Sequence, residues 1–475
     1  MEAVSRAREA ASWWAGLSFR ERRDHLLNWK RVIAARSDEL GDVIHEETGK
    51  PVGDALLEIM LAVEHLDWAA RNAPRVLKRR RVRSGLLAAD QGAAVEYRPL
   101  GVIGVIGPWN YPVYTPLGSI SYALAAGNAV VFKPSEHTPR TGEWLAAAWA
   151  AISAKPVLQV ITGDGAVGAQ LVAAGVDKIA FTGSAATGRR VMAACAETLT
   201  PVVIEGGGKD AMIVAADADL DAAAKAAAFG GFGNAGQTCA GVERVYVERA
   251  VYPEFLAKLA AIAESVEPSE DGPYGRMTVA TQVDIVRNHV DDALAKGGRA
   301  VVGGPESIKP PYVFPVVLAE VPEDSTAVTE ETFGPTVVVN PVSSLDEAVS
   351  LANASRYGLA ASIFSSDRGN SLKIARRLRT GAASINSVLG FAGVPALPFG
   401  GVGDSGFGRV HGADGLREFS RPQSVTWRRL KAPMDVMSLT RDPAVLDRAI
   451  RIFRLRHARG AANSASSKWP GHPGA

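Results

Sequence analysis

Short apolar runs alternate with helical patterns between residues 100 and 207, and this alternation limits the fold more than any other feature of the chain. The runs VIGVI, AVVF, VLQVI, KIAF and PVVI are strand-like, and a stretch with helical spacing separates each from the next. This order predicts a parallel sheet with helices on both faces. Such a sheet usually binds a nucleotide at the carboxyl ends of its strands.

A second α/β series follows over residues 208–400. Its predicted strands are AMIVAA, RVYVE, AVVGG, TVVVNPV, AASIFS and AASINS, and its predicted helices cover 219–229, 250–265, 281–296, 345–354 and 368–379. Before the first series, helical spacing covers 5–45 and stops at TGKP, and a long helix is predicted over 53–82. We interpret its basic end, KRRRVR, as a solvated helix end, and 93–101 as a strand.

Composition limits the classes of binding partner and the cellular compartment that we expect for this chain. A net charge of +2 over 475 residues argues against nucleic acid as the main partner. Only two cysteines are present, so we expect no disulfide framework and a reducing, cytoplasmic location. No metal-ligand spacing is found in the sequence, and neither a signal core nor a membrane-spanning run is predicted.

One cysteine lies where a nucleophile would be expected. Cys239 occupies a turn of small residues, FGNAGQTCAG, just ahead of the strand-like run VERVYV. Upstream, Glu205 ends an apolar run, where its carboxylate could transfer protons. Asn110 lies in the turn PWNYP after another predicted strand and could donate to an oxyanion. These three residues are the predicted catalytic set.

Seven motifs then occur in one order: PWNYP, KPSE, FTGS, EGGGK, GQTC, EETFGP and PFGGVGDSGFGR. With them the chain resembles the NAD(P)-dependent aldehyde dehydrogenase superfamily from about residue 10 to about residue 428. One departure is Gly206, which stands where the family usually has Leu.

The resemblance implies a fold and an assembly. It implies a Rossmann-type NAD-binding domain (1–82 and 100–207), a second α/β catalytic domain (208–402) and oligomerisation segments (83–99, as a β-hairpin, and 403–430). A homodimer or homotetramer is expected. The implied reaction is NAD-dependent oxidation of an aldehyde to a carboxylic acid through a cysteine thiohemiacetal and thioester.

The resemblance also implies a cofactor site. Its expected residues are Ile106, Pro108, Trp109, Lys133, Glu136, Gly163, Gly183, Ser184, Gly207, Gln282, Glu331 and Phe333. The pattern G-x-G-x-x-G occurs at 163–168 and again at 401–406, so it decides nothing alone. The carboxylate of Glu136 would accept hydrogen bonds from ribose hydroxyls and would repel a 2′-phosphate. This favours NAD as the cofactor, and NADP stays possible.

Substrate choice is expected from side chains near the nucleophile. The predicted channel residues are Tyr111, Thr115, Thr238, Ala240 and Phe391. They include no Arg clamp for a carboxylate, which favours a neutral aliphatic or aromatic aldehyde. Alternatives are succinate semialdehyde as the substrate, a non-catalytic nucleotide-binding structural protein, and a thiol hydrolase.

The tail over 431–475 is basic and departs from the family ending. A helix is predicted after Asp442, with Leu446, Ala449, Ile450 and Phe453 on one face and Arg448, Arg451 and Arg454 opposite. Such a helix could lie on an anionic membrane or pack on its own oligomer. Residues 460–475 are predicted to be disordered.

Overall fold

The computed structural model describes residues 2–430 and 436–458. The chain forms two compact units: residues 1–78 with 97–421, and residues 79–96 with 422–475. The first unit holds both predicted α/β series. The second holds most of the predicted hairpin (83–99), and the predicted oligomerisation segments stay a prediction.

A six-stranded sheet forms from the first series, in the order β17-β7-β6-β3-β4-β5. Its strands are β3 (Val102–Ile106), β4 (Ala129–Lys133), β5 (Leu158–Val160), β6 (Lys178–Thr182), β7 (Val202–Glu205) and the antiparallel edge strand β17 (Gly406–Phe407). The five others run parallel, as predicted. The crossover helices are α5 (Tyr114–Ala126), α6 (Pro139–Ala150), α7 (Gly165–Ala173) and α8 (Ala185–Ala196).

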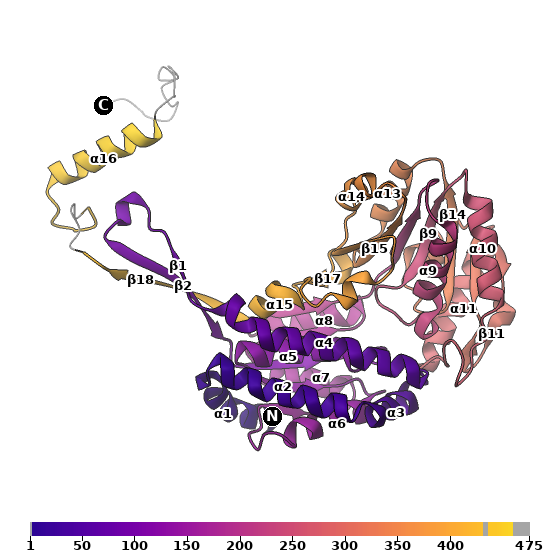
Figure 1. The fold of residues 1–475 in the computed structure, drawn as a ribbon, viewed down its shortest axis with the longest axis horizontal. Coiled ribbons are helices and arrows are strands. Elements are labelled where there is room, and N and C mark those ends of the chain that lie inside the picture. The colour runs from indigo at the N-terminus through magenta and orange to yellow at the C-terminus, as the bar shows by residue number, and fades with distance from the viewer. Residues whose placement is uncertain (1, 431–435, 459–475) are drawn as a thin grey trace. The chain divides into compact units, whose positions relative to one another are not determined.

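Helices from the N-terminal region pack on this sheet and on one another. They are α1 (Glu2–Gly16), α2 (Phe19–Ala35), α3 (Ser37–Thr48) and α4 (Val52–Leu77), and α4 packs on α2, α3 and α5 (Figure 1). A capping box at Ser18 starts α2, and Gly49 ends α3 at φ 76°, which confirms the predicted stop at TGKP. Trp14, Trp29 and Trp149 are buried together in the core.

The interpretation of KRRRVR as a helix end is wrong. Helix α4 ends at Leu77, and the basic run continues into strand β1 (Arg80–Val82), which pairs antiparallel with β2 (Gln91–Pro99). Exposed arginines suit an edge strand, where charge discourages further pairing. Strand β18 (Ser420–Arg428) completes this three-stranded sheet on the other side of β2.

The second series forms a seven-stranded sheet in the order β10-β13-β14-β9-β8-β15-β16. Its strands are β8 (Asp210–Val214), β9 (Val242–Glu248), β10 (Arg299–Val302), β13 (Val316–Ala319), β14 (Thr336–Val342), β15 (Ala360–Phe364) and β16 (Ala382–Ile385); a small hairpin joins β11 (Ile308–Lys309) and β12 (Tyr312–Val313). Its helices are α9 (Leu220–Phe232), α10 (Tyr252–Glu264), α11 (Ala280–Ala295), α12 (Thr326–Thr329), α13 (Leu345–Ala354) and α14 (Arg368–Ala375), with α9 and α10 beside β9 (Figure 1).

Two helices follow this sheet in the chain. Helix α15 (Gly412–Glu418) returns to the first sheet and packs on α4 and α5. The predicted tail helix is confirmed as α16 (Pro443–His457), with Asp442 as its N-cap. The predicted disorder of 460–475 and part of the tail, 431–435, lie outside the described residues. Within the described ranges, no helix is long and apolar enough to cross a membrane.

Candidate active site

The thiol of Cys239 and the carboxyl group of Glu205 lie in contact. Glu205 is the last residue of β7, and Cys239 lies in the turn just before β9 of the other sheet. The thiol donates to Glu205 Oε1 over 3.4 Å, and Thr182 Oγ1 donates to the other carboxyl oxygen over 3.3 Å. The structure therefore places a nucleophile and a base within reach of proton transfer.

A strained turn presents Cys239. Asn234, Ala235 and Gly236 have φ values of 55°, 56° and 71° in succession. At Gly236 a Cβ would also overlap the backbone of Gly334, so only glycine fits. Hydrogen bonds between Asn234 and Gln237 close the turn, with Asn234 Nδ2 donating over 3.1 Å and Gln237 Nε2 donating back over 2.9 Å. Strain of this kind is commonly held at functional sites.

Burial sets the protonation of this pair. It raises the pKa of Glu205 to about 7, although the hydrogen bonds from Cys239 and Thr182 lower it. Burial, followed by the charge of Glu205, raises the pKa of Cys239 well above its usual range. Cys239 is therefore a thiol in the free protein, and Glu205 is the group that changes charge near neutral pH.

Asn110 lies in the predicted turn after β3 and is buried. Its Nδ2 donates to Gln237 O over 2.9 Å, so one N–H of the amide is used by the turn that carries Cys239 and the other stays available. The backbone carbonyl oxygen of Asn110 accepts from Lys50 Nζ over 3.0 Å and from Asn234 Nδ2 over 3.2 Å. Hydrogen bonds to its side-chain amide and to its backbone carbonyl therefore hold Asn110, the predicted oxyanion donor, in place.

A buried ion pair that the sequence analysis missed supports the same turn. Lys50 Nζ lies 2.5 Å from Glu58 Oε2, and both side chains are buried. Glu58 Oε1 accepts from the N–H groups of Val113 and Tyr114 over 2.8 and 3.0 Å. The TGKP motif that holds Lys50 was predicted only as a helix stop, and nothing local in the sequence pairs it with Glu58.

A cavity of about 240 Å³ borders Cys239, and we call it the polar cavity because polar side chains such as Glu331, Gln282 and Ser184 line part of it. Eight of the residues predicted for the cofactor line it: Pro108, Trp109, Gly183, Ser184, Gly207, Gln282, Glu331 and Phe333. Asn110 and Cys239 line it too, as do Thr182, Gly206 and Ile285, which the sequence analysis did not assign to it. Thr182 had a signal, because it belongs to the FTGS motif.

The other four predicted cofactor residues lie outside this lining. Ile106 and Lys133 are paired residues at the carboxyl ends of β3 and β4, and Gly163 follows β5. Glu136 follows β4, and its carboxylate lies 3.4 Å from Lys133 Nζ. Because these parallel strands are neighbours, the four residues lie close to the carboxyl ends of the strands, where such sheets bind nucleotides.

The polar cavity suits a dinucleotide. Ser184 caps α8, and the first turn of this fully described helix has no acidic residue, so its dipole and amides face the cavity without a competing charge. At Gly207 a Cβ would overlap the carboxylate of Glu331, so glycine makes the room. Trp109 and Phe333 meet edge to face, 5.4 Å between ring centroids, and form an aromatic wall.

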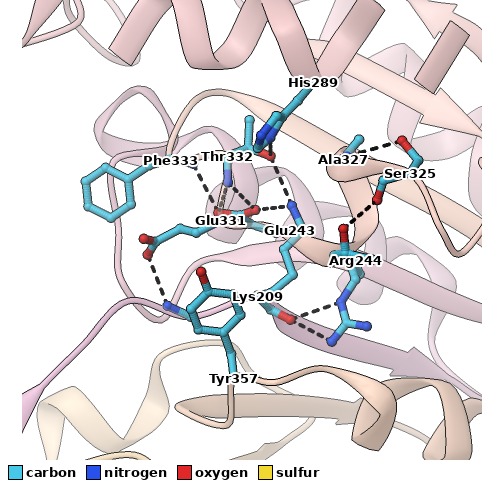
Figure 2. Close-up of polar contacts among 12 residues, drawn as sticks. Lys209, Glu243, Arg244, His289, Ser325, Ala327, Glu331, Thr332, Phe333 and Tyr357 are labelled. Atoms are coloured by element: carbon cyan, nitrogen blue, oxygen red, sulfur yellow. Dashed lines mark hydrogen bonds and ion pairs between the residues drawn. The ribbon is translucent and has the colours of Figure 1, made fainter. Parts of the chain in front are cut away.

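A buried network holds the Glu331 loop in place (Figure 2). Glu243 is ion-paired with Lys209 and accepts from the N–H groups of Thr332 (2.9 Å) and Phe333 (3.1 Å). Lys209 also donates to Thr332 Oγ1 over 3.0 Å. This ties the loop to the segment that follows Glu205 in the sequence.

Glu331 itself carries a perturbed carboxyl group. Its Oε1 accepts from Gly208 N–H over 3.0 Å (Figure 2). Burial and then the charge of Glu243 raise its pKa to about 8, while the Gly208 hydrogen bond and Lys209 lower it. A carboxyl group that is costly to ionise in the free protein is a candidate for ligand binding.

A second cavity, which is apolar and has a volume of about 300 Å³, also borders Cys239, and this residue belongs to both linings. All five predicted channel residues line it: Tyr111, Thr115, Thr238, Ala240 and Phe391. Further apolar lining comes from Leu57, Leu61, Tyr114, Phe229, Val388, Leu389, Phe399 and Val410. Leu57 and Phe229 are exposed, so they form an apolar rim.

Charged groups in the apolar cavity do not favour an anionic substrate. Lys50 is the one Lys or Arg in its described lining, and Glu58 neutralises it. Asp54 and Glu205 add carboxyl groups, and burial raises the pKa of both. A substrate carboxylate would thus meet acidic groups and no free cation.

Comparison with known proteins now decides the family. The sequence model described as "Aldehyde dehydrogenase family" matches residues 1–425. The chain belongs to this family. Its function is therefore aldehyde oxidation, and the resemblance drawn from the seven motifs is confirmed.

Several similar proteins support the assignment. A Methylomonas sp. protein named 4,4'-diapolycopene aldehyde oxidase is 42% identical over 91% of this chain and 82% of its own. A Mycolicibacterium smegmatis protein, provisionally named succinate-semialdehyde dehydrogenase (NADP(+)), is 38% identical over 90% and 84%. The crystal structure of an NAD-dependent aldehyde dehydrogenase from Sinorhizobium meliloti has a TM-score of 0.86 at 34% identity, over 91% of this chain and 88% of that one.

The departure at Gly206 has a local structural reason within this aldehyde dehydrogenase. A Cβ at this position would lie 2.6 Å from Asp404 O and 3.2 Å from Ser405 Cα. Gly206 N–H donates to Ser405 O over 3.0 Å. The backbone that precedes β17 thus packs directly against the backbone that follows Glu205, and this close contact leaves no room for a side chain at position 206.

The raised pKa of Glu205 predicts a pH-dependent stability difference. The native carboxyl group holds its proton up to about pH 7, whereas the unfolded one ionises near its usual 4.5, so this group destabilises the fold as pH rises through that window. Glu205→Gln should therefore be more stable than wild type at pH 8, by on the order of 2–4 kcal/mol, and similar at pH 4.5.

Thermal unfolding midpoints at the two pH values measure this difference. Glu264→Gln, at an exposed position, is the matched control and should change neither midpoint. A Glu205→Gln difference that is equal at both pH values would contradict the assigned protonation.

Proposed function

We propose that this aldehyde dehydrogenase oxidises neutral, apolar aldehydes to carboxylic acids, with NAD preferred over NADP, through a thioester on Cys239. The observation that carries the proposal is the position of Cys239, which lines both the polar cavity and the apolar cavity, with Glu205 in contact. An aldehyde and a dinucleotide could therefore reach the same sulfur from two different cavities.

In the first step, Cys239 Sγ bonds to the carbonyl carbon while its proton moves to the carboxylate of Glu205. The new oxyanion would accept from the free amide N–H of Asn110 and the backbone N–H of Cys239. Loss of one such donor typically slows a reaction about 100- to 1,000-fold. Because the proton moves as the bond forms, the thiolate need not accumulate despite its raised pKa.

The dinucleotide would lie against Trp109, Phe333 and the start of α8, with Glu331 near its ribose and Lys133 and Glu136 toward its other end. A bound nicotinamide would supply the hydride acceptor, so that the carbon on Cys239 would lose a hydride and remain as a thioester. Glu205 first releases to solvent the proton that it took from Cys239. It then takes a proton from water while the oxygen bonds to the acyl carbon, and as the C–S bond breaks this proton passes to the sulfur, which releases the acid and restores the thiol.

The substrate proposal rests on the lining of the apolar cavity, which offers aromatic and aliphatic side chains and a cation already paired with Glu58. The name of the Methylomonas relative, an aldehyde oxidase acting on 4,4'-diapolycopene aldehyde, agrees with an apolar substrate. Succinate semialdehyde is the second candidate, because several relatives carry that name. Its carboxylate would have no free cation in the described lining.

A panel of aldehydes tests the function. We expect NADH formation with medium and long alkyl and aromatic aldehydes, at least about 100-fold weaker kcat/KM for succinate semialdehyde, and complete loss in Cys239→Ala. Cys195→Ala is the matched control, because this second cysteine is buried in the core. Preference for succinate semialdehyde would favour the second candidate, and no turnover at all would favour a non-catalytic binding protein.

Cofactor choice gives a separate prediction at Glu136, whose side chain is half exposed. Because its carboxylate would repel a 2′-phosphate, Glu136→Gln should improve kcat/KM for NADP about tenfold and weaken that for NAD severalfold. Initial rates with both cofactors measure the ratio, with Glu143→Gln, an exposed carboxylate on α6, as the control. An unchanged ratio would show that Glu136 does not select the cofactor.

Assembly as a homodimer or homotetramer and a cytoplasmic location complete the proposal. The β1–β2 hairpin and β18 are the segments expected to pair between subunits, because β1 and β18 are the outer strands of their sheet in the described part of the chain.

A further inference from the structure

Charge is divided very unevenly between the two units. Residues 79–96 and 422–475 contain fourteen Lys and Arg against five Asp and Glu, a net charge of +9. Because the whole chain carries +2, the remaining residues carry −7. The near-neutral total therefore conceals a strongly basic second unit, which the sequence analysis did not separate from the rest.

Helix α16 in this unit is amphipathic. At 100° per residue, Leu446, Ala449, Ile450 and Phe453 fall on one arc, and Arg448, Arg451 and Arg454 fall on the rest of the circumference. On this arc Ala449 is buried and Leu446 and Ile450 are half-buried, whereas Phe453 is 57% exposed although its ring contacts His457 of the same helix. Arg456 lies at the margin of the arc, where a long side chain can keep its charge in water.

We infer that α16 docks the protein on an anionic lipid bilayer, parallel to its surface. Arginines on the polar side with Phe and Leu on the other are the signature of an interfacial helix, and α16 is too short and too charged to span. Arginines close to an anionic membrane surface are attracted to it, and each one adds to the binding. The inference rests in part on the proposed function, because an apolar aldehyde partitions into lipid.

Two other binding partners fit α16 less well than a bilayer does. An interface with a second copy of the chain would place several arginines in a contact, where charged residues are usually depleted. Nucleic acid would pair with the arginines but would leave the apolar arc in water. Only a bilayer takes both sides of the helix.

Vesicle sedimentation with the full chain tests the inference. Wild type should bind phosphatidylcholine vesicles that contain phosphatidylglycerol at least about tenfold more tightly than pure phosphatidylcholine, and high salt should weaken binding. Phe453→Glu should lower binding about tenfold or more. Leu455→Glu is the matched control: it is 62% exposed, lies opposite Leu446 on the polar side, and gains the same charge, so most binding should remain.

Each alternative has its own outcome. Absence of binding by wild type, or equal losses in the two variants, would overturn the inference. A change of oligomeric state in Phe453→Glu with vesicle binding intact would assign the helix to a second copy. Equal affinity for single-stranded DNA and vesicles, unaffected by Phe453→Glu, would point to a polyanion site and also overturn it.

The test separates this inference from the proposed function. Oxidation of a short, water-soluble alkyl aldehyde should be the same in wild type and Phe453→Glu, because α16 is not part of the active site. If wild type oxidises no aldehyde, the proposed function fails while vesicle binding still decides the role of α16.

Discussion

The contact between the Glu205 carboxyl and the Cys239 thiol is the constraint on which the site depends. Two acidic groups 3.4 Å apart in a buried place cannot both be charged at neutral pH, so a proton must be held between them. The sheet fixes Glu205 at the end of β7, and the left-handed turn through Gly236 fixes Cys239. In the proposed mechanism, this shared proton would let the sulfur attack a carbonyl without an exposed thiolate.

The buried polar groups around Cys239 can be understood from the same contact between Glu205 and Cys239. Glu331 is a second carboxyl group with a raised pKa, and the buried Lys209–Glu243 pair holds its loop against the segment after Glu205. Lys50 and Glu58 make a comparable buried pair behind Asn110. Buried charges of this kind are poor sources of stability, and their value here is a fixed geometry around Cys239.

Much of this could be predicted from the sequence, because motif order carries information that periodicity lacks. The strands around Glu205 and the turn at Cys239 follow from apolar runs and small residues. The Lys50–Glu58 pair and Phe229 in the cavity rim could not be predicted, since each becomes functional only when distant helices meet. Strand β13 was missed and KRRRVR was misread because short strands are decided by their partners, not by their own sequence.

The alkylation rate of Cys239 by iodoacetamide as a function of pH, in a Cys195→Ala background, tests the central contact most directly. Wild type should show a thiol pKa clearly above the ordinary value of 9, and Glu205→Gln should lower it, because burial remains while the neighbouring charge is removed. A wild-type pKa at or below the ordinary value, unchanged by Glu205→Gln, would contradict the account.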